Sequence, residues 1–274
     1  MDLGLVGVRL LHFAATMTLF GASLFGPVVA PWRRRFGPPL AGLALASALA
    51  WLAFVSRDMA GDFAAFGDVL TGTAFGRVWL LRLALLGPLV AATLWPDRRE
   101  CAPATLAGLC VASLGLVGHA AMQAGALGLA HRLNQAVHLL AIAAWIGGLP
   151  AFLVCLRLYA RAGRRDALAA MRRYSRIGHF AVAAVFVSGA LNVAMTTHAL
   201  PWPPITPYRF GLDVKMLLFA IMVVLALLNR YAFAPRISRH AGAAPALAAG
   251  ALVEIALALS ALALVSAFAT LDPR

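Results

Sequence analysis

The sequence predicts an all-α polytopic membrane protein with eight transmembrane helices, because composition and pattern agree. Hydrophobic residues make up 62% of the 274 residues, charged residues only 12%, and the mean hydropathy is +0.86. An average soluble domain has about 25% charged residues. Apolar runs long enough to cross a bilayer as helices follow one another with little chain between them. The eight runs are residues 3–29, 38–57, 76–95, 102–123, 130–158, 176–200, 210–233 and 243–267. We therefore expect a single membrane domain over residues 1–274.

The first four runs carry few polar residues. The first contains His12, starts without basic residues and is followed by Arg33–Arg35, which is not the pattern of a cleaved signal peptide. After the second run, the glycine-rich segment 61–76 predicts an outer loop with short helices. The third run contains Arg82, and the fourth ends in "GHAAMQAG".

The last four runs hold most of the polar residues. The fifth opens with "HRLNQAVHLLAIAAWIGGL", in which positions 131, 134, 135 and 138 fall on one helix face. The tetrapeptide 145–148 in the same run predicts close helix packing, because glycine lets another helix approach. The sixth run ends in "AMTTHAL", the seventh contains Lys215 and the eighth contains Glu254.

The net charge of +13 is distributed as in a membrane protein rather than a nucleic-acid-binding protein. An eight-span chain places 15 of the 23 Lys and Arg residues on one side and 8 on the other. Positive residues stay on the cytoplasmic side, so we expect both termini in the periplasm and the basic loop 161–173 in the cytoplasm. The lipid bilayer is the expected partner, nucleic acid is not, and the oligomeric state is left open.

We expect two parallel four-helix repeats, residues 1–125 and 126–274. The first and fifth runs align on a histidine, and the third and seventh align on a basic residue. The matched residues are His12 with His138, Gly21 with Gly147, and Arg82 with Lys215. Membrane sites often lie where such repeats meet, so a pseudo-two-fold axis could bring His12 and His138 face to face.

Imidazole and thioether side chains gather toward the expected outer face, which indicates a copper site. Imidazole suits copper in either oxidation state, and thioether sulfur prefers Cu⁺ over Cu²⁺. Polar groups inside a span tend to be functional, although a methionine there is more often a packing residue. The candidate metal ligands are His12, His138, His119, His131, Met17, Met122, His198 and Met195.

Glu254 is the acid that lies well inside a span. A carboxyl group in hydrocarbon must be protonated or paired. Arg82, Lys215 and Arg230 lie at similar expected depth and are candidate partners. The acid therefore predicts either an internal ion pair or a proton-coupling group, and the sequence leaves both open.

These residues together resemble the CopD-type copper-resistance membrane proteins. The resemblance rests on "GHA", the H-x6-H-x6-W-x-G-G-L block from His131, "TPYRFGLDVK", "LLNR" and Glu254. It implies an eight-span bacterial inner-membrane protein, not an enzyme, that moves copper from the periplasm inward, often with a small periplasmic copper-binding partner. Family members usually carry an acid where this chain has Asn134, so attraction of a cation by that position is in doubt.

Two other functions are compatible with the sequence. In the first, a b-type haem redox protein, His12 and His138 would clamp one haem iron. In the second, an assembly factor would hand copper to an oxidase. The oxidation state of the copper, the direction of its movement and the driving force are not determined by the sequence.

Overall fold

The protein is an all-α polytopic membrane protein in the computed structural model, which describes residues 2–61, 66–95, 101–118, 123–197, 207–237 and 242–268. Within these ranges, seven helical segments are long and apolar enough to cross a bilayer. They are Leu3–Ser23, Gly26–Ala60, Ala74–Leu94, Gly125–Ala162, Arg165–Thr196, Arg209–Arg236 and Ala243–Ala267.

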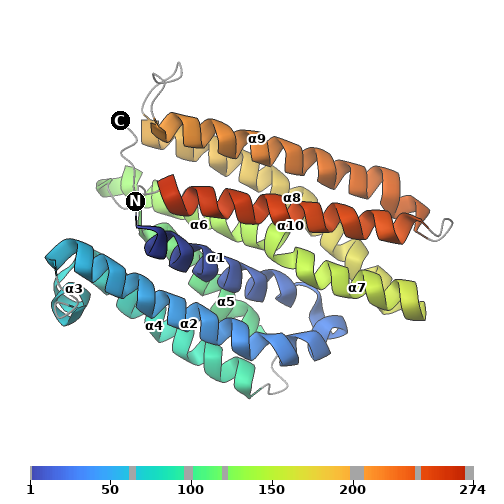
Figure 1. Cartoon of the computed structure of the whole chain (residues 1–274), viewed down its shortest axis with the longest axis horizontal. Helices are drawn as coiled ribbons and strands as arrows, with labels where there is room; N and C mark the ends of the chain where they lie inside the picture. Colours follow the sequence, from blue (N-terminus) through green and yellow to red (C-terminus); the bar gives the residue numbers. More distant parts are fainter. Residues whose placement is uncertain are drawn as a thin grey trace.

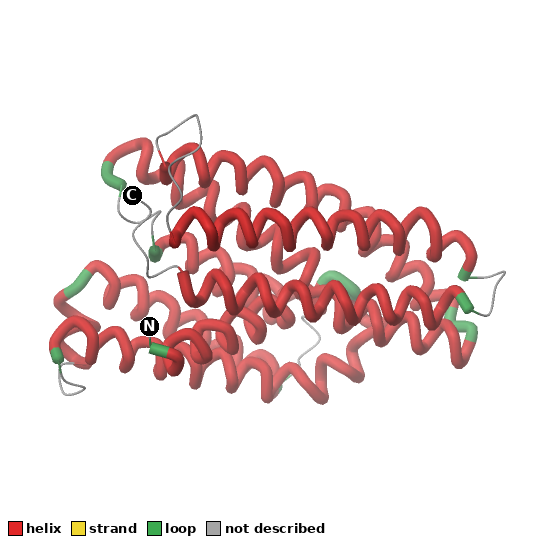
Figure 2. The backbone as a smooth tube through the Cα atoms, turned by 45° about the horizontal axis from the view of Figure 1, so that its top comes forward, coloured by secondary structure: helices red, strands yellow, loops and turns green. Residues whose placement is uncertain are grey.

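The helices run along a common direction and form one bundle (Figures 1 and 2). In chain order they are α1 (Leu3–Ser23), η1 (Gly26–Val29), α2 (Ala30–Ala60), the short α3 (Phe66–Gly72), α4 (Ala74–Leu94), α5 (Cys101–Ser113), η3 (Leu114–Leu116), α6 (Gly125–Trp145), η5 (Ile146–Gly148), α7 (Leu149–Ala162), α8 (Arg165–Thr197), α9 (Pro207–Leu227), the π-helix η6 (Leu228–Phe233), η7 (Ala234–Arg236) and α10 (Ala243–Phe268). The short helix expected in segment 61–76 is α3.

The two ends of the bundle differ in charge, and different helices begin and end at each. The start of α1, the start of α6 and the end of α10 lie at one end, which we call the N-terminal end (Figure 1). The α7–α8 connection lies at the other, which we call the basic end because it holds Arg161, Arg164 and Arg165.

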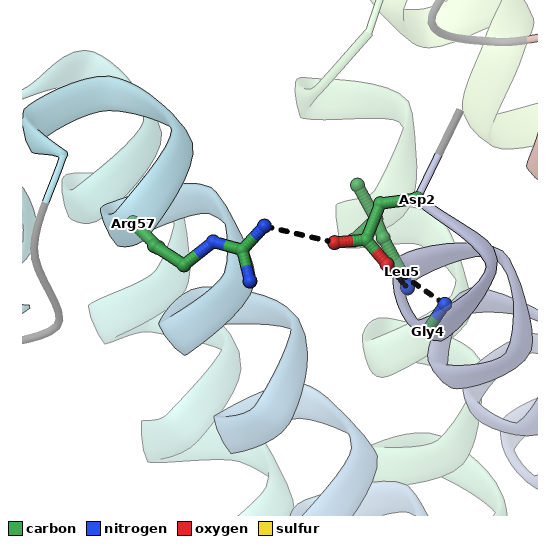
Figure 3. Close-up of polar contacts among 4 residues, drawn as sticks. All are labelled: Asp2, Gly4, Leu5 and Arg57. Atoms are coloured by element: carbon green, nitrogen blue, oxygen red, sulfur yellow. Dashed lines mark hydrogen bonds and ion pairs between the residues drawn. The ribbon is translucent and has the colours of Figure 1, made fainter.

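A cap and an ion pair fix the N-terminal end of α1. The Asp2 carboxylate accepts hydrogen bonds from the backbone N–H groups of Gly4 (2.8 Å) and Leu5 (3.3 Å), as an N-cap does. The same carboxylate lies 3.3 Å from the guanidinium of Arg57 near the end of α2 (Figure 3). These contacts connect the neighbouring ends of α1 and α2.

The fourth expected span, 102–123, is shorter than the apolar run that predicted it. Its apolar helix covers Ala102–Leu116; Val117 is extended (φ −126°, ψ 166°), and Gly118 follows with a φ of +79°. A left-handed residue cannot continue a right-handed helix, and glycine adopts this conformation at little cost. The helix therefore ends before the run does.

The basic loop expected over 161–173 is also shorter than predicted. Gly163, with a φ of +62°, caps α7, and α8 already begins at Arg165. Most of the basic segment therefore forms the first turns of α8, because "RRDALAAMRR" is rich in good helix formers.

Close packing through glycine at the α6–α7 junction is confirmed. A Cβ atom on Gly147 would lie 1.9 Å from the carbonyl oxygen of Met17, and one on Gly21 would lie 2.2 Å from Gly147. Side chains at these positions would force α1 away from η5. The junction thus brings the first helix against the middle of the α6–α7 span.

Candidate functional site

A row of polar side chains connects α6 to α8, and we call it the α6–α8 seam. At its N-terminal end the Gln123 amide donates to the backbone carbonyl of Met195 (2.6 Å). The Gln123 carbonyl oxygen lies 3.1 Å from Nδ1 of His131, which is 3% exposed. An amide oxygen only accepts, so Nδ1 of His131 donates the hydrogen bond to Gln123.

Amide side chains continue the seam one turn deeper. Asn134 donates to the carbonyl of Ser188 and to the Asn192 side chain, both at 2.8 Å. Asn192 in turn donates to the Gln135 carbonyl oxygen at 2.6 Å. The polar face at the start of the fifth apolar run therefore faces α8, where amide pairs satisfy one another away from lipid.

His138 ends the seam, seven residues and about 10 Å beyond His131 along the helix axis. It is 5% exposed, and its Nδ1 lies 2.9 Å from the hydroxyl of Ser188. That hydroxyl donates to the carbonyl of Ala184, so it accepts from Nδ1. Nε2 of His138 is then the unprotonated nitrogen, the form that binds metal. Lys215 is close enough to interact electrostatically with this imidazole.

His12 occupies a similar setting among the first helices. It is fully buried, and its Nδ1 lies 3.0 Å from the carbonyl of Ala44 and 3.1 Å from the hydroxyl of Ser47, both on α2. Its Nε2 contacts the guanidinium of Arg82. An arginine has no acceptor, so Nε2 accepts and Nδ1 carries the proton.

Arg82 is held from three sides. Besides His12, it donates to the carbonyl of Cys110 (3.0 Å) and to the hydroxyl of Ser113 (2.7 Å) on α5. It is fully buried. The group therefore joins α1, α2, α4 and α5 around one cation.

The structure does not bring His12 and His138 onto a common partner. His12 bonds to α2 and α4, whereas His138 bonds to α8. Met17 lies five residues after His12, on a different face of α1, and packs in a core cluster with Trp51 and Leu139. Nothing in this arrangement supports one haem clamped between the two histidines.

Glu254 is 2% exposed and sits in a pocket of neutral donors. Its carboxylate accepts from the side chains of Asn229 (2.7 Å) and Trp145. Gly250 makes room for this, since a Cβ there would lie 2.2 Å from the Asn229 amide oxygen. Of the cations expected as partners, Arg82 bonds to His12 and Arg230 bonds to Ser175.

Replacing Glu254 by glutamine should therefore preserve more folded protein than replacing it by leucine. Glutamine keeps a carbonyl acceptor, whereas leucine leaves the donors of Asn229 and Trp145 unsatisfied, at about 1–3 kcal/mol each. Thermal unfolding of the two variants in the same detergent measures the difference. Equal midpoints would mean that these hydrogen bonds contribute nothing to stability.

Three candidate ligands, His119, Met122 and His198, lie outside the described residues. Within the described part of the chain, no group of three or more His, Cys, Asp and Glu side chains is placed to hold a metal ion. His131 and Met195 are adjacent in space through Gln123, and they flank the segments that hold these three residues.

Sequence reasoning missed the α8 half of the seam. Ser188 and Asn192 are one turn apart in an otherwise apolar stretch, "VSGALNVAM". The same spacing argument that selected His131 and His138 would have found them. Ser47, the hydroxyl against His12, gave no signal beyond being a small polar residue.

Comparison with known proteins gives consistent matches. Residues 1–129 match the family described as "Copper resistance protein D-like, N-terminal domain", and residues 168–268 match "Copper resistance protein D". The chain is 35% identical over 292 residues to "Inner membrane protein YebZ" of Escherichia coli K12, covering 98% of each protein. It is 27% identical over 303 residues to "Copper resistance protein D" of Pseudomonas syringae pv. tomato, covering 98% of this chain and 96% of that one. No solved structure matches it.

Proposed function

Because this chain belongs to the copper resistance protein D family, we propose that it is a multi-pass inner-membrane protein that binds copper at the α6–α8 seam and passes it from the periplasm inward. The observation that carries the proposal is the seam itself. It buries His131 and His138 on one helix face, each with Nδ1 donating to a fixed acceptor.

The chemistry of the seam suits copper. Imidazole nitrogen and thioether sulfur are copper ligands, and the seam residues include no carboxylate that would favour magnesium or calcium. Gln123 and Ser188 fix the tautomer and ring orientation of the two histidines, as outer-shell partners of metal-binding histidines do. His119, Met122, His198 and the side chain of Met195 would complete an outer site around His131.

The spacing of the two histidines supports movement of copper along the seam. His131 and His138 are too far apart, about 10 Å along the axis, to share one ion. Copper captured at His131 would therefore move to Nε2 of His138 as a second position. Such a ladder of sites passes an ion on because each site binds moderately rather than tightly.

His12 differs from the seam histidines because its metal-binding nitrogen is already occupied. Nε2 is the nitrogen it would offer to copper, but this nitrogen accepts from Arg82. Copper can bind there only when Arg82 withdraws. We therefore place His12 late in the path, behind a cation that must move first.

The two halves of the chain, 1–125 and 126–274, are proposed to be parallel four-helix repeats. In the first, Ser47 and the carbonyl three residues before it face Nδ1 of His12. In the second, Ser188 and the carbonyl of Val185 take the same places beside His138. Arg82 contacts its histidine, and Lys215 interacts electrostatically with the matched histidine, His138.

Both termini are proposed to face the periplasm and the α7–α8 connection the cytoplasm. A single cysteine placed at Arg165, in a background without Cys101, Cys110 and Cys155, should resist a membrane-impermeant thiol reagent in intact cells. A cysteine at Asp58, near the N-terminal end, should react. Labelling of position 165 from the periplasmic side would reverse the orientation.

Metal and haem analysis of detergent-purified protein tests the function directly. We expect bound copper after reconstitution with Cu⁺ under reducing conditions, and a cell that expresses the gene should accumulate more copper. A visible Soret band instead of copper would replace the proposal with the haem function. Copper binding without accumulation would favour a protein that delivers copper to another protein rather than one that transports it. The partner proposed to supply the copper is a small periplasmic copper-binding protein.

A further inference from the structure

A cavity of about 900 Å³ lies between α7, α8, α9, η6 and α10, away from the copper seam. Ligand pockets commonly have volumes of about 300–1,000 Å³. The π-helix η6 borders it and supplies Arg230 to its lining. π-helical turns are frequent at functional sites, and neither the cavity nor this turn has a role in copper binding as proposed.

The wall of the cavity is largely apolar. Phe152 from α7 and Phe219 and Val223 from α9 line it. Phe186 of α8 also lines it and is 65% exposed on the flank of the bundle. In a bundle that spans a bilayer this flank faces hydrocarbon, so the cavity can be entered by a lipid chain.

The rim of the cavity is cationic. Arg172 and Arg176 are one turn apart on α8, so they share a face, and both are exposed. Arg230 joins them, held by the carbonyl and hydroxyl of Ser175. In the ranges that the structure describes, none of these three guanidiniums forms an ion pair with a carboxylate.

Glu254 does not neutralise this rim. Among the described residues that line the cavity, Glu254 is the one acidic residue. It is buried, and its carboxylate accepts hydrogen bonds from Asn229 and Trp145. Three arginines beside an apolar wall therefore remain without a counter-charge. Arginine binds phosphate by paired N–H donors, and basic pockets between transmembrane helices bind anionic lipid head groups.

We propose that this cavity binds one anionic phospholipid, with its phosphate between Arg172, Arg176 and Arg230 and an acyl chain along the apolar wall. A soluble anion would leave the wall empty, and a zwitterionic lipid would bring a cation to a rim that is already positive. The lipid would fill the space between α8 and α9. This inference does not depend on the copper path.

The test uses the full chain, purified in dodecyl maltoside and delipidated, and titrated with palmitoyl-oleoyl phosphatidylglycerol or phosphatidylcholine under native mass spectrometry. We expect one phosphatidylglycerol to bind more tightly than phosphatidylcholine. The double change Arg172→Ala and Arg176→Ala should weaken it about thirtyfold, which is about 2 kcal/mol, or about 1 kcal/mol for each arginine.

The matched control is Arg34→Ala with Arg35→Ala, an exposed basic pair near the start of α2 that does not line the cavity. It removes the same net charge and should bind phosphatidylglycerol as the parent protein does. Equal weakening in both double variants would overturn the proposal, because it would reduce the effect to overall charge. Equal affinity for the two lipids would also overturn it.

A second variant tests the apolar wall without touching the charges. Gly178 lines the cavity, and a Cβ atom there would meet nothing within 4 Å, so Gly178→Phe adds a ring where space is free. We expect it to abolish binding of phosphatidylglycerol, while Gly87→Phe, at an equally open position on α4, does not. Retained binding in Gly178→Phe, or displacement of the lipid by millimolar inorganic phosphate, would contradict a lipid site.

Discussion

Replacing His138 by alanine is expected to lower the copper affinity of the second seam position, the one at His138, by at least about 100-fold, while the position at His131 keeps its copper. Loss of an outer-shell partner of a metal ligand typically costs about 10–100-fold, and loss of the ligand itself should reach the upper part of that range or exceed it. Nε2 of His138 is the deepest metal-binding nitrogen of the seam, so no neighbouring residue replaces it. Competition with a calibrated Cu⁺ chelator measures the affinity.

Three companion variants make this result specific. Ser188→Ala removes the hydroxyl that accepts from Nδ1 of His138 and leaves the carbonyl of Val185, so it should weaken binding by about 10-fold, the lower part of the range for an outer-shell partner. His179→Ala is the control: this histidine bonds to Ser175 and Tyr231 away from the seam and should leave copper binding unchanged. His131→Ala should have a partial effect because other outer ligands remain. Parent-like affinity in His138→Ala would remove this residue from the path.

Replacing His12 by alanine is expected to destabilise the protein by at least about 1.5–3 kcal/mol, the usual contribution of a hydrogen bond to a charged group. The fully buried Arg82 would lose its bond to His12, while its Nε already has no hydrogen-bond partner within the described residues. Reversible unfolding by SDS in mixed micelles measures the free energy of unfolding of each variant.

A double-mutant cycle separates this contact from a general loss of packing. His12→Ala combined with Arg82→Met should cost less than the sum of the two single changes, with a coupling energy of about 0.5–3 kcal/mol. Arg9→Met is the control on the same helix, since Arg9 contacts Trp51 and Ser266 rather than His12. Additive losses for His12 and Arg82 would show that their contact does not stabilise the fold.

Expectations drawn from helical spacing held better than those drawn from expected depth. Spacing placed residues 131, 134, 135 and 138 on one face, and that face packs on α8. Depth suggested Arg82 as a partner for Glu254, but Arg82 bonds to His12. Depth fixes one coordinate of a side chain, whereas a contact needs all three.

Sequence by itself determined that this chain is an all-α membrane protein, where its long helices lie, and which positions share a helix face. These follow from the number of apolar residues needed to cross hydrocarbon and from the period of the α-helix. Tertiary structure decided which helix each polar face meets: His138 and Ser188 are 50 residues apart, and His12 and Arg82 are 70 apart. It also ended the fourth apolar helix early and brought Gly21 against Gly147. Local periodicity carries no information about which remote helix fills a given face, because that depends on how all the helices pack together.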